Sequence, residues 1–78
     1  MAERYLVVGG IYTHFKGGEY LVEAVATHTE TSEQLVMYVN IRNAEKVWAR
    51  PYKDFMSEVD RKKYPEATQK FRFELKGD

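Results

Sequence analysis

The sequence contains no cysteine, so it offers no disulfide, no thiolate zinc site and no cysteine nucleophile. It also lacks long apolar runs: Tyr-Leu-Val-Val at residues 5–8 is far too short for a signal peptide or a membrane span. Net charge is absent as well, because 12 basic residues balance 12 acidic ones, and no overall field attracts nucleic acid or an anionic membrane. We therefore expect a cytoplasmic protein without a membrane partner.

Aromatic residues are plentiful instead, at 14% of the chain, and they argue against disorder despite 31% charged residues. The length predicts a single domain over residues 1–78. A domain of this size buries only about 60% of the surface that its unfolded chain exposes, so each large apolar side chain matters to the core. The charges are unevenly placed: residues 1–39 carry two basic and five acidic groups, and residues 40–78 carry ten and seven.

Two turn signals predict an antiparallel meander. Gly17-Gly18, between two β-like runs, is typical of a two-residue hairpin turn, and this register places Tyr12 opposite Glu23. A second turn at residues 29–32, or one tightened to residues 30–31, places Glu23 opposite Tyr38. The two hairpins predict one core face and one largely polar face. The core face of the first hairpin contains Ile11, Thr13, Phe15, Tyr20, Val22 and Ala24, and the polar face contains Tyr12, His14, Lys16, Glu19, Leu21 and Glu23.

The third connection, at residues 42–46, has two interpretations. A five-residue loop puts Val47 in the core and Trp48 on the polar face with Arg50. A four-residue loop turns the strand over and buries Trp48 against Val39. The charged neighbours of Trp48 favour the outward position, but the sequence leaves open whether this side chain is buried or exposed.

The remainder predicts an all-β fold with one short helical turn. Pro51 ends the fourth strand, residues 54–59 form the helical turn, and the strict alternation of residues 69–75 predicts a final strand with its apolar side chains inward. Phe71, Phe73 and Leu75 are these inward residues. We predict a small five-stranded SH3-like antiparallel barrel. The alternative is an open antiparallel meander with a short helix packed on it.

Four stretches follow one another between residues 10 and 60: GIYTHFKGGEYLV, VATHTET, LVMY and VWARPYKDFMSEV. In this order they resemble the small bacterial family known as domain of unknown function 1653. The resemblance implies an SH3-like barrel and brings no established activity. The chain departs from the family pattern at VNIRNAEKVW, where a leucine-tyrosine pair and a glycine turn are expected. The positions that match the pattern are Gly10, Tyr12, His14, Lys16, Gly17, Tyr20, His28, Glu30, Thr31, Tyr38, Trp48, Arg50, Pro51 and Phe55.

No constellation of residues supports catalysis or metal binding. His14 and His28 do not converge in the predicted register, and neither serine in the predicted turns has a base and a carboxylate beside it. His28 and Glu30 lack a third metal ligand, so both are predicted to stabilise a turn. We therefore name no catalytic residue, no metal ligand and no cofactor, and the sequence favours a binding module over an enzyme.

The polar face of the predicted sheet is the candidate binding surface. An aromatic groove with adjacent charges suits a peptide or protein segment, proline-rich or cationic, held through cation–π contacts. The alternative is a single-stranded nucleic acid or a nucleotide, with bases stacked on the tyrosines. The ligand itself cannot be named from the sequence. The candidate residues are Tyr12, His14, Lys16, Glu23, Tyr38, Trp48 and Arg50.

Overall fold

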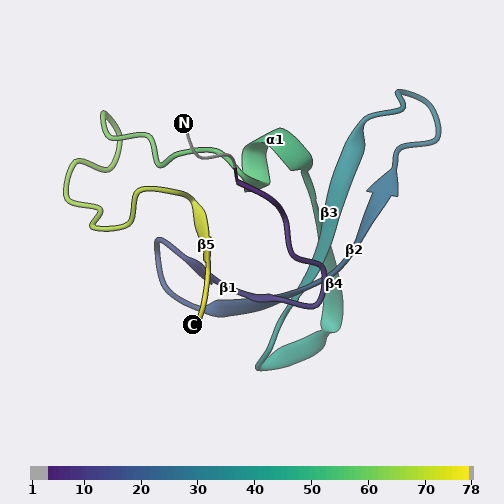
Figure 1. The fold of residues 1–78 in the computed structure, drawn as a ribbon, viewed down its shortest axis with the longest axis horizontal. Helices are drawn as coiled ribbons and strands as arrows, with labels where there is room; N and C mark the ends of the chain where they lie inside the picture. The colour runs from purple at the N-terminus through teal and green to yellow at the C-terminus, as the bar shows by residue number, and fades with distance from the viewer. Residues whose placement is uncertain (1–3, 78) are drawn as a thin grey trace.

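The computed structural model describes residues 4–77 and contains one five-stranded antiparallel sheet with a short helix (Figure 1). The spatial order of the strands is β4-β3-β2-β1-β5. Figure 1 shows the segment between α1 and β5 extending away from the sheet before β5 returns beside β1. The elements are β1 (Ile11–His14), β2 (Glu19–Thr27), β3 (Gln34–Asn40), β4 (Asn43–Pro51), α1 (Tyr52–Phe55) and β5 (Phe73–Leu75).

The sheet is open. β4 and β5 are its two edges, and no pairing joins them within residues 4–77, so the strands do not close into a barrel. The predicted alternative, an open antiparallel meander with a short helix packed on it, describes this arrangement. The helix spans four residues, Tyr52–Phe55, directly after Pro51 rather than residues 54–59. No helix within the described residues has the length and apolarity needed to cross a membrane.

The first hairpin turns through three residues, Phe15 to Gly17, instead of the predicted Gly17-Gly18 pair. The His14 N–H donates to the carbonyl of Gly18 at 3.1 Å, and the Gly17 N–H donates to the carbonyl of His14 at 2.8 Å. Inside the turn the Lys16 N–H donates to Nδ1 of His14 at 3.1 Å. Gly17 has a φ of 104°, which L-residues with a side chain rarely adopt. The histidine side chain and the glycine together place the turn earlier than glycine content alone suggests.

This earlier turn reverses the predicted faces of β1. Tyr12 pairs with Tyr20 and Thr13 with Glu19. The shift relative to the prediction is an odd number of residues, so every β1 side chain moves to the opposite face of the sheet. Tyr12 is consequently in the core at 1% exposure, and its predicted place on the polar face is wrong. Ile11 and Thr13 lie on the other face and not in the core.

The second hairpin follows the predicted register only at its far end. Ala24 pairs with Met37 as predicted, but a β-bulge at Glu23 shifts the ladder, and Val22 pairs with Tyr38. The predicted juxtaposition of Glu23 with Tyr38 is therefore wrong. Glu23 is exposed at the bulge, and Tyr38 is 5% exposed in the core.

The third connection matches neither predicted loop. Asn40 pairs with Asn43, and after a second irregularity Tyr38 pairs with Trp48. Val47 is 51% exposed, so it is not a core residue. Trp48 lies on the same face of the sheet as Tyr38, but it stands on an edge strand and keeps 44% of its surface exposed. Trp48 is therefore neither fully buried nor fully exposed: its side chain lies on the core side of the sheet and remains accessible to solvent.

Aromatic rings form most of the core. Phe55 of α1 stacks on Phe73 of β5 with a centroid distance of 4.0 Å and an interplanar angle of 7°. Tyr12 and Tyr38 each contact Phe55 edge-on at 5.4 Å. Val22 and Phe73 are 0% and 1% exposed, as predicted for core residues. These contacts pack the helix against the core face of the sheet and join it to the edge strand β5.

The last strand is shorter than predicted. Only Phe73–Leu75 pair with β1, where Phe73 lies opposite His14. Phe71 is half-buried and forms an isolated bridge with Glu58. Leu75 is 47% exposed, so of the three predicted inward residues only Phe73 is fully buried.

We predict that Phe73→Ala lowers the free energy of unfolding by about 3–5 kcal/mol, because it removes a buried ring and leaves a cavity. A small domain has little more than about 5 kcal/mol in total. Urea denaturation followed by circular dichroism measures the loss. Leu75→Ala, in the same strand but half exposed, is the control and should cost no more than about 1 kcal/mol. Equal denaturation midpoints for the two variants would contradict the position assigned to Phe73.

Candidate functional site

A small pocket opens where the aromatic core reaches the surface. Its volume is about 170 Å³, and each of the five strands contributes at least one side chain to it. Since these side chains come from the same face of the sheet, the register described above decides which of them meet. We refer to this hollow as the aromatic pocket. Its lining residues are His14, Tyr20, Tyr38, Trp48, Arg50 and Phe73.

Edge-to-face ring contacts fix the walls of the aromatic pocket. Tyr20 lies 5.5 Å from Tyr38 and 5.8 Å from Phe73, measured between ring centroids. His14 lies 4.7 Å from Phe73 in the same kind of contact. Aromatic pairs of this geometry contribute about 0.5–1.5 kcal/mol each beyond their buried area. The pocket is therefore built from side chains that already hold one another in place.

Arg50 provides the charge of the aromatic pocket. Its Nε–H donates to the Tyr38 hydroxyl at 3.3 Å, and its guanidinium carbon lies 5.7 Å from the centroid of Phe73. Within residues 4–77 the ion pair present joins Lys76 to Glu19, so Arg50 has no carboxylate partner there. The guanidinium is thus oriented through Nε, while its terminal nitrogens remain available to an anion.

His14 is neutral near pH 7. Burial, and to a smaller extent the positive charges of Arg50, Arg72 and Lys16, together lower the pKa of its imidazole to about 4. The Nδ1 atom accepts the Lys16 N–H, so the proton of the neutral ring resides on Nε2. Protonating this ring would remove the acceptor that shapes the first turn and would add a charge beside Arg50.

A second hollow of about 330 Å³ adjoins the aromatic pocket and shares Tyr20 and Trp48 with it. The Nζ of Lys46 lies 4.5 Å from the ring centroid of Trp48. We call the two hollows together the aromatic–cationic groove. No Asp or Glu lies among the described residues that line it. The residues added by the second hollow are Asn40, Arg42, Asn43 and Lys46.

The structure brings together four of the seven residues proposed from the sequence: His14, Tyr38, Trp48 and Arg50. Sequence reasoning assigned Tyr20 and Phe73 to the core and missed their part in this pocket. A turn beginning directly after His14 would have placed Tyr20 on the same face, and the histidine side chain is the signal for that turn.

The other three proposed residues lie elsewhere. Tyr12 is buried in the core and does not line the pocket, and its hydroxyl accepts the Val7 N–H at 2.9 Å, which is a structural role. Lys16 lines a different hollow, and Glu23 is exposed at the bulge of β2. The proposed residues of β1, β3 and β4 therefore lie on the core side of the sheet, whereas the polar residues proposed on β2 lie on its other face.

His28 stabilises a turn, as predicted. Its Nδ1 accepts the N–H groups of Glu30 and Thr31 at 3.1 and 3.3 Å. Its backbone N–H donates to the carbonyl of Glu33 at 2.7 Å, which closes the predicted loop at residues 29–32. Within residues 4–77 no three His, Asp or Glu side chains gather in a way that would hold a metal ion.

We predict that acid destabilises the protein through His14. The unfolded chain binds the imidazole proton near the ordinary pKa of 6.5, and the folded protein binds it near 4. Between these values the unfolded state holds more protons, so the free energy of unfolding falls as the pH falls through this window. Denaturant titrations across the window measure the decline.

His14→Asn is the matched variant for this experiment. The Asn side chain can accept the N–H two residues ahead, as in an Asx turn, but it does not titrate. The variant should lose less stability than the parent between about pH 6.5 and 4, since both share every other titrating group. Parallel curves for the two proteins would show that His14 is not the group responsible.

The family model described as "Protein of unknown function (DUF1653)" matches residues 10–75, which is most of the chain and contains the stretches that carry the sequence resemblance. No curated protein and no solved structure matches the chain. The geometry of the groove therefore has to carry the functional argument.

Proposed function

Because the chain belongs to the DUF1653 family of unknown function, we propose its function from the groove: a non-catalytic binding module for anionic ligands that carry a flat ring, such as nucleotides. The observation that carries the proposal is the composition of the groove. Aromatic rings form its walls, Arg42, Lys46 and Arg50 provide positive charge, and no described carboxylate lines it.

Each part of such a ligand has a counterpart in the groove. Trp48 is 44% exposed, so part of its ring surface is available for a base to stack on. Arg50 offers a planar fork of N–H donors that suits the oxygens of a phosphate group. Its hydrogen bond to Tyr38 orients the fork before a ligand arrives, which lowers the entropic cost of binding.

The volumes support a division of roles between the hollows. Sites for whole drug-sized ligands usually measure about 300–1,000 Å³. The aromatic pocket, at about 170 Å³, is suited to a single ring or a phosphate, and the adjoining hollow of about 330 Å³ has room for the rest of a nucleotide.

The sequence pattern favoured a peptide or protein segment, and the charges now favour the nucleotide alternative. Recognition of a cationic segment depended on Glu23 beside the tyrosines, but Glu23 lies outside the groove. A proline-rich segment would use the aromatic walls and leave the cations without a partner. The likeness to SH3-like domains remains part of the proposal, on the basis of a strongly bent five-stranded sheet (Figure 1).

We predict that adenosine monophosphate quenches the fluorescence of the protein in a saturable manner. Trp48 is the single tryptophan of the chain and lines both hollows of the groove, so the signal reports on this site. Arg50→Gln should weaken the affinity by roughly tenfold or more, because hydrogen bonds to charged groups contribute about 1.5–3 kcal/mol. Lys53→Gln removes an equal charge from α1 and should leave the affinity unchanged.

Adenosine without its phosphate separates stacking from charge in the same assay. It should bind the parent more weakly than the monophosphate does, and this difference should become smaller in Arg50→Gln, which keeps Arg42 and Lys46. A thermal melt of Arg50→Gln close to that of the parent would show that the fold is intact. If a proline-rich peptide saturates the quenching and the monophosphate does not, the peptide interpretation is correct and the nucleotide proposal is wrong.

A further inference from the structure

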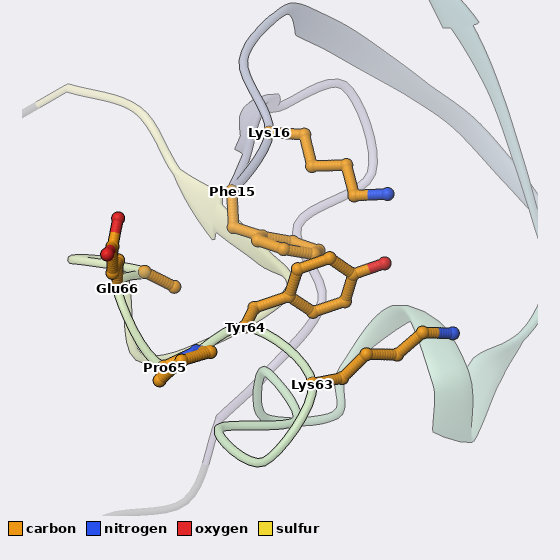
Figure 2. A pocket seen from close by; sticks show the side chains of 7 residues that line it. Phe15, Lys16, Lys63, Tyr64, Pro65 and Glu66 are labelled. Carbon is orange, nitrogen blue, oxygen red and sulfur yellow. The ribbon is translucent and has the colours of Figure 1, made fainter.

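A third hollow of about 430 Å³ lies beside the first turn, outside the groove described above (Figure 2). Phe15 and Tyr64 form its aromatic wall, with their ring centroids 4.9 Å apart. The Nζ atoms of Lys16 and Lys63 lie 4.7 and 5.9 Å from the centroid of Tyr64. Figure 2 shows both ammonium groups and the Tyr64 hydroxyl on one side, and the carboxylate of Glu66 on the other. Like the groove, this hollow is lined by aromatic rings and cations, but unlike the groove it also has a carboxylate, that of Glu66, in its lining.

An unbroken series of ring contacts links this hollow to the aromatic pocket. From Tyr64 the series passes to Phe15, then over 4.8 Å to His14 and over 6.3 Å to Tyr20. Tyr20 continues it to Tyr38 at 5.5 Å. The two sites meet at the adjacent residues His14 and Phe15, since His14 lines the aromatic pocket and Phe15 lines the third hollow.

Two cations act on both sites. The guanidinium carbon of Arg72 lies 5.9 Å from the centroid of Phe15. Besides the larger effect of burial, Arg72 and Lys16 help to lower the pKa of His14 in the aromatic pocket. At the other site a hydrogen bond with Lys16, followed by nearby positive charges that include Arg72, lowers the pKa of Tyr64. Arg72 and Lys16 therefore lie close enough to influence a side chain of each hollow.

We propose that the groove and the third hollow form one continuous strip that binds a single strand of nucleic acid. This inference rests on the proposed function and extends it from a nucleotide to a polymer. Successive flat rings separated by regular negative charges match a strip in which aromatic faces and cations alternate. A mononucleotide fills one part of the strip and leaves the rest without a ligand. The basic side chains along it are Arg42, Lys46, Arg50, Arg72, Lys16 and Lys63.

The test compares thymidylate as a monomer, dinucleotide, tetranucleotide and octanucleotide. Trp48 quenching follows the short ligands, and the anisotropy of a labelled strand follows the long ones. The affinity should rise roughly tenfold or more from the monomer to the octanucleotide, since additional stacking rings become engaged. A duplex of the same sequence should bind more weakly, because its bases are not free to stack on the protein.

Tyr64 distinguishes the strip from the groove alone. Tyr64→Ala should weaken octanucleotide binding about 5- to 100-fold and leave monomer binding unchanged, whereas Tyr64→Phe, which keeps the ring, should retain the affinity. Lys63→Gln should lower the slope of log affinity against log salt by about 0.7, the value expected for one phosphate contact to a single strand. Lys53→Gln is again the control outside both sites and should leave the slope unchanged.

The outcomes separate the two proposals. If the monomer binds as well as the octanucleotide and Tyr64→Ala has no effect on either, the strip is wrong and the nucleotide site stands. If no length of strand and no monomer binds, the proposed function itself fails. Equal affinity for duplex and single strand would reduce the surface to a charged patch without base stacking. A polyglutamate peptide that competes with equal affinity would show that charge alone, and not nucleic acid, is recognised.

Discussion

The stack of Phe55 on Phe73 is the contact on which the remaining architecture depends. Because β4 and β5 are unpaired edges within the described residues, no backbone ladder connects the two ends of the sheet. The ring stack makes that connection, since Phe73 belongs to β5 and Phe55 follows β4 directly in α1. Arg4 fastens the same junction from outside by donating to the carbonyls of Met56 and Phe73 at 2.7 and 2.6 Å. The aromatic pocket is the point at which this core, closed by side chains, meets solvent.

Several turns of the protein are stabilised in the same way, and this explains why the site was only partly predictable. In each case a side chain accepts the backbone N–H two residues ahead, as an Asx turn does. Asn40 and Asp60 are of the residue types that commonly form such a turn, so the sequence predicts it there, but histidine is not a usual signal for it. Reading Gly17-Gly18 as the whole turn therefore placed it too late. The acceptors are His14, His28, Thr31, Asn40 and Asp60.

The strand pattern predicted the number of strands and the grouping of residues better than it predicted which face is covered. Tyr12, Tyr38, Trp48 and Arg50 do share a face, because the register errors at the first turn and at the bulge each reverse the face and so cancel between β1 and β3. That this face is the core followed from a three-residue turn and from the bulge at Glu23, neither of which alternation can detect. In a chain rich in tyrosine the composition of a face does not show its burial, since a tyrosine ring packs in a core while its hydroxyl finds a hydrogen-bond partner, as that of Tyr12 does.

Net charge is a poor guide to this protein because it does not describe the charges around a single site: Arg42, Lys46 and Arg50 line the groove, and no described carboxylate does. Glu30 and Glu33 lie in or beside the loop that joins β2 and β3, and Figure 1 shows that loop and the segment between α1 and β5, which carries Lys63, at opposite sides of the molecule. In physiological salt an exposed charge is largely screened beyond about 8 Å, so glutamates at the far loop do little to offset cations that touch a ligand. The lining of the groove is therefore positive although the chain as a whole is neutral. Exposed charges act mainly over short distances. The affinity of the proposed ligand should therefore depend strongly on the salt concentration and on individual lysine side chains.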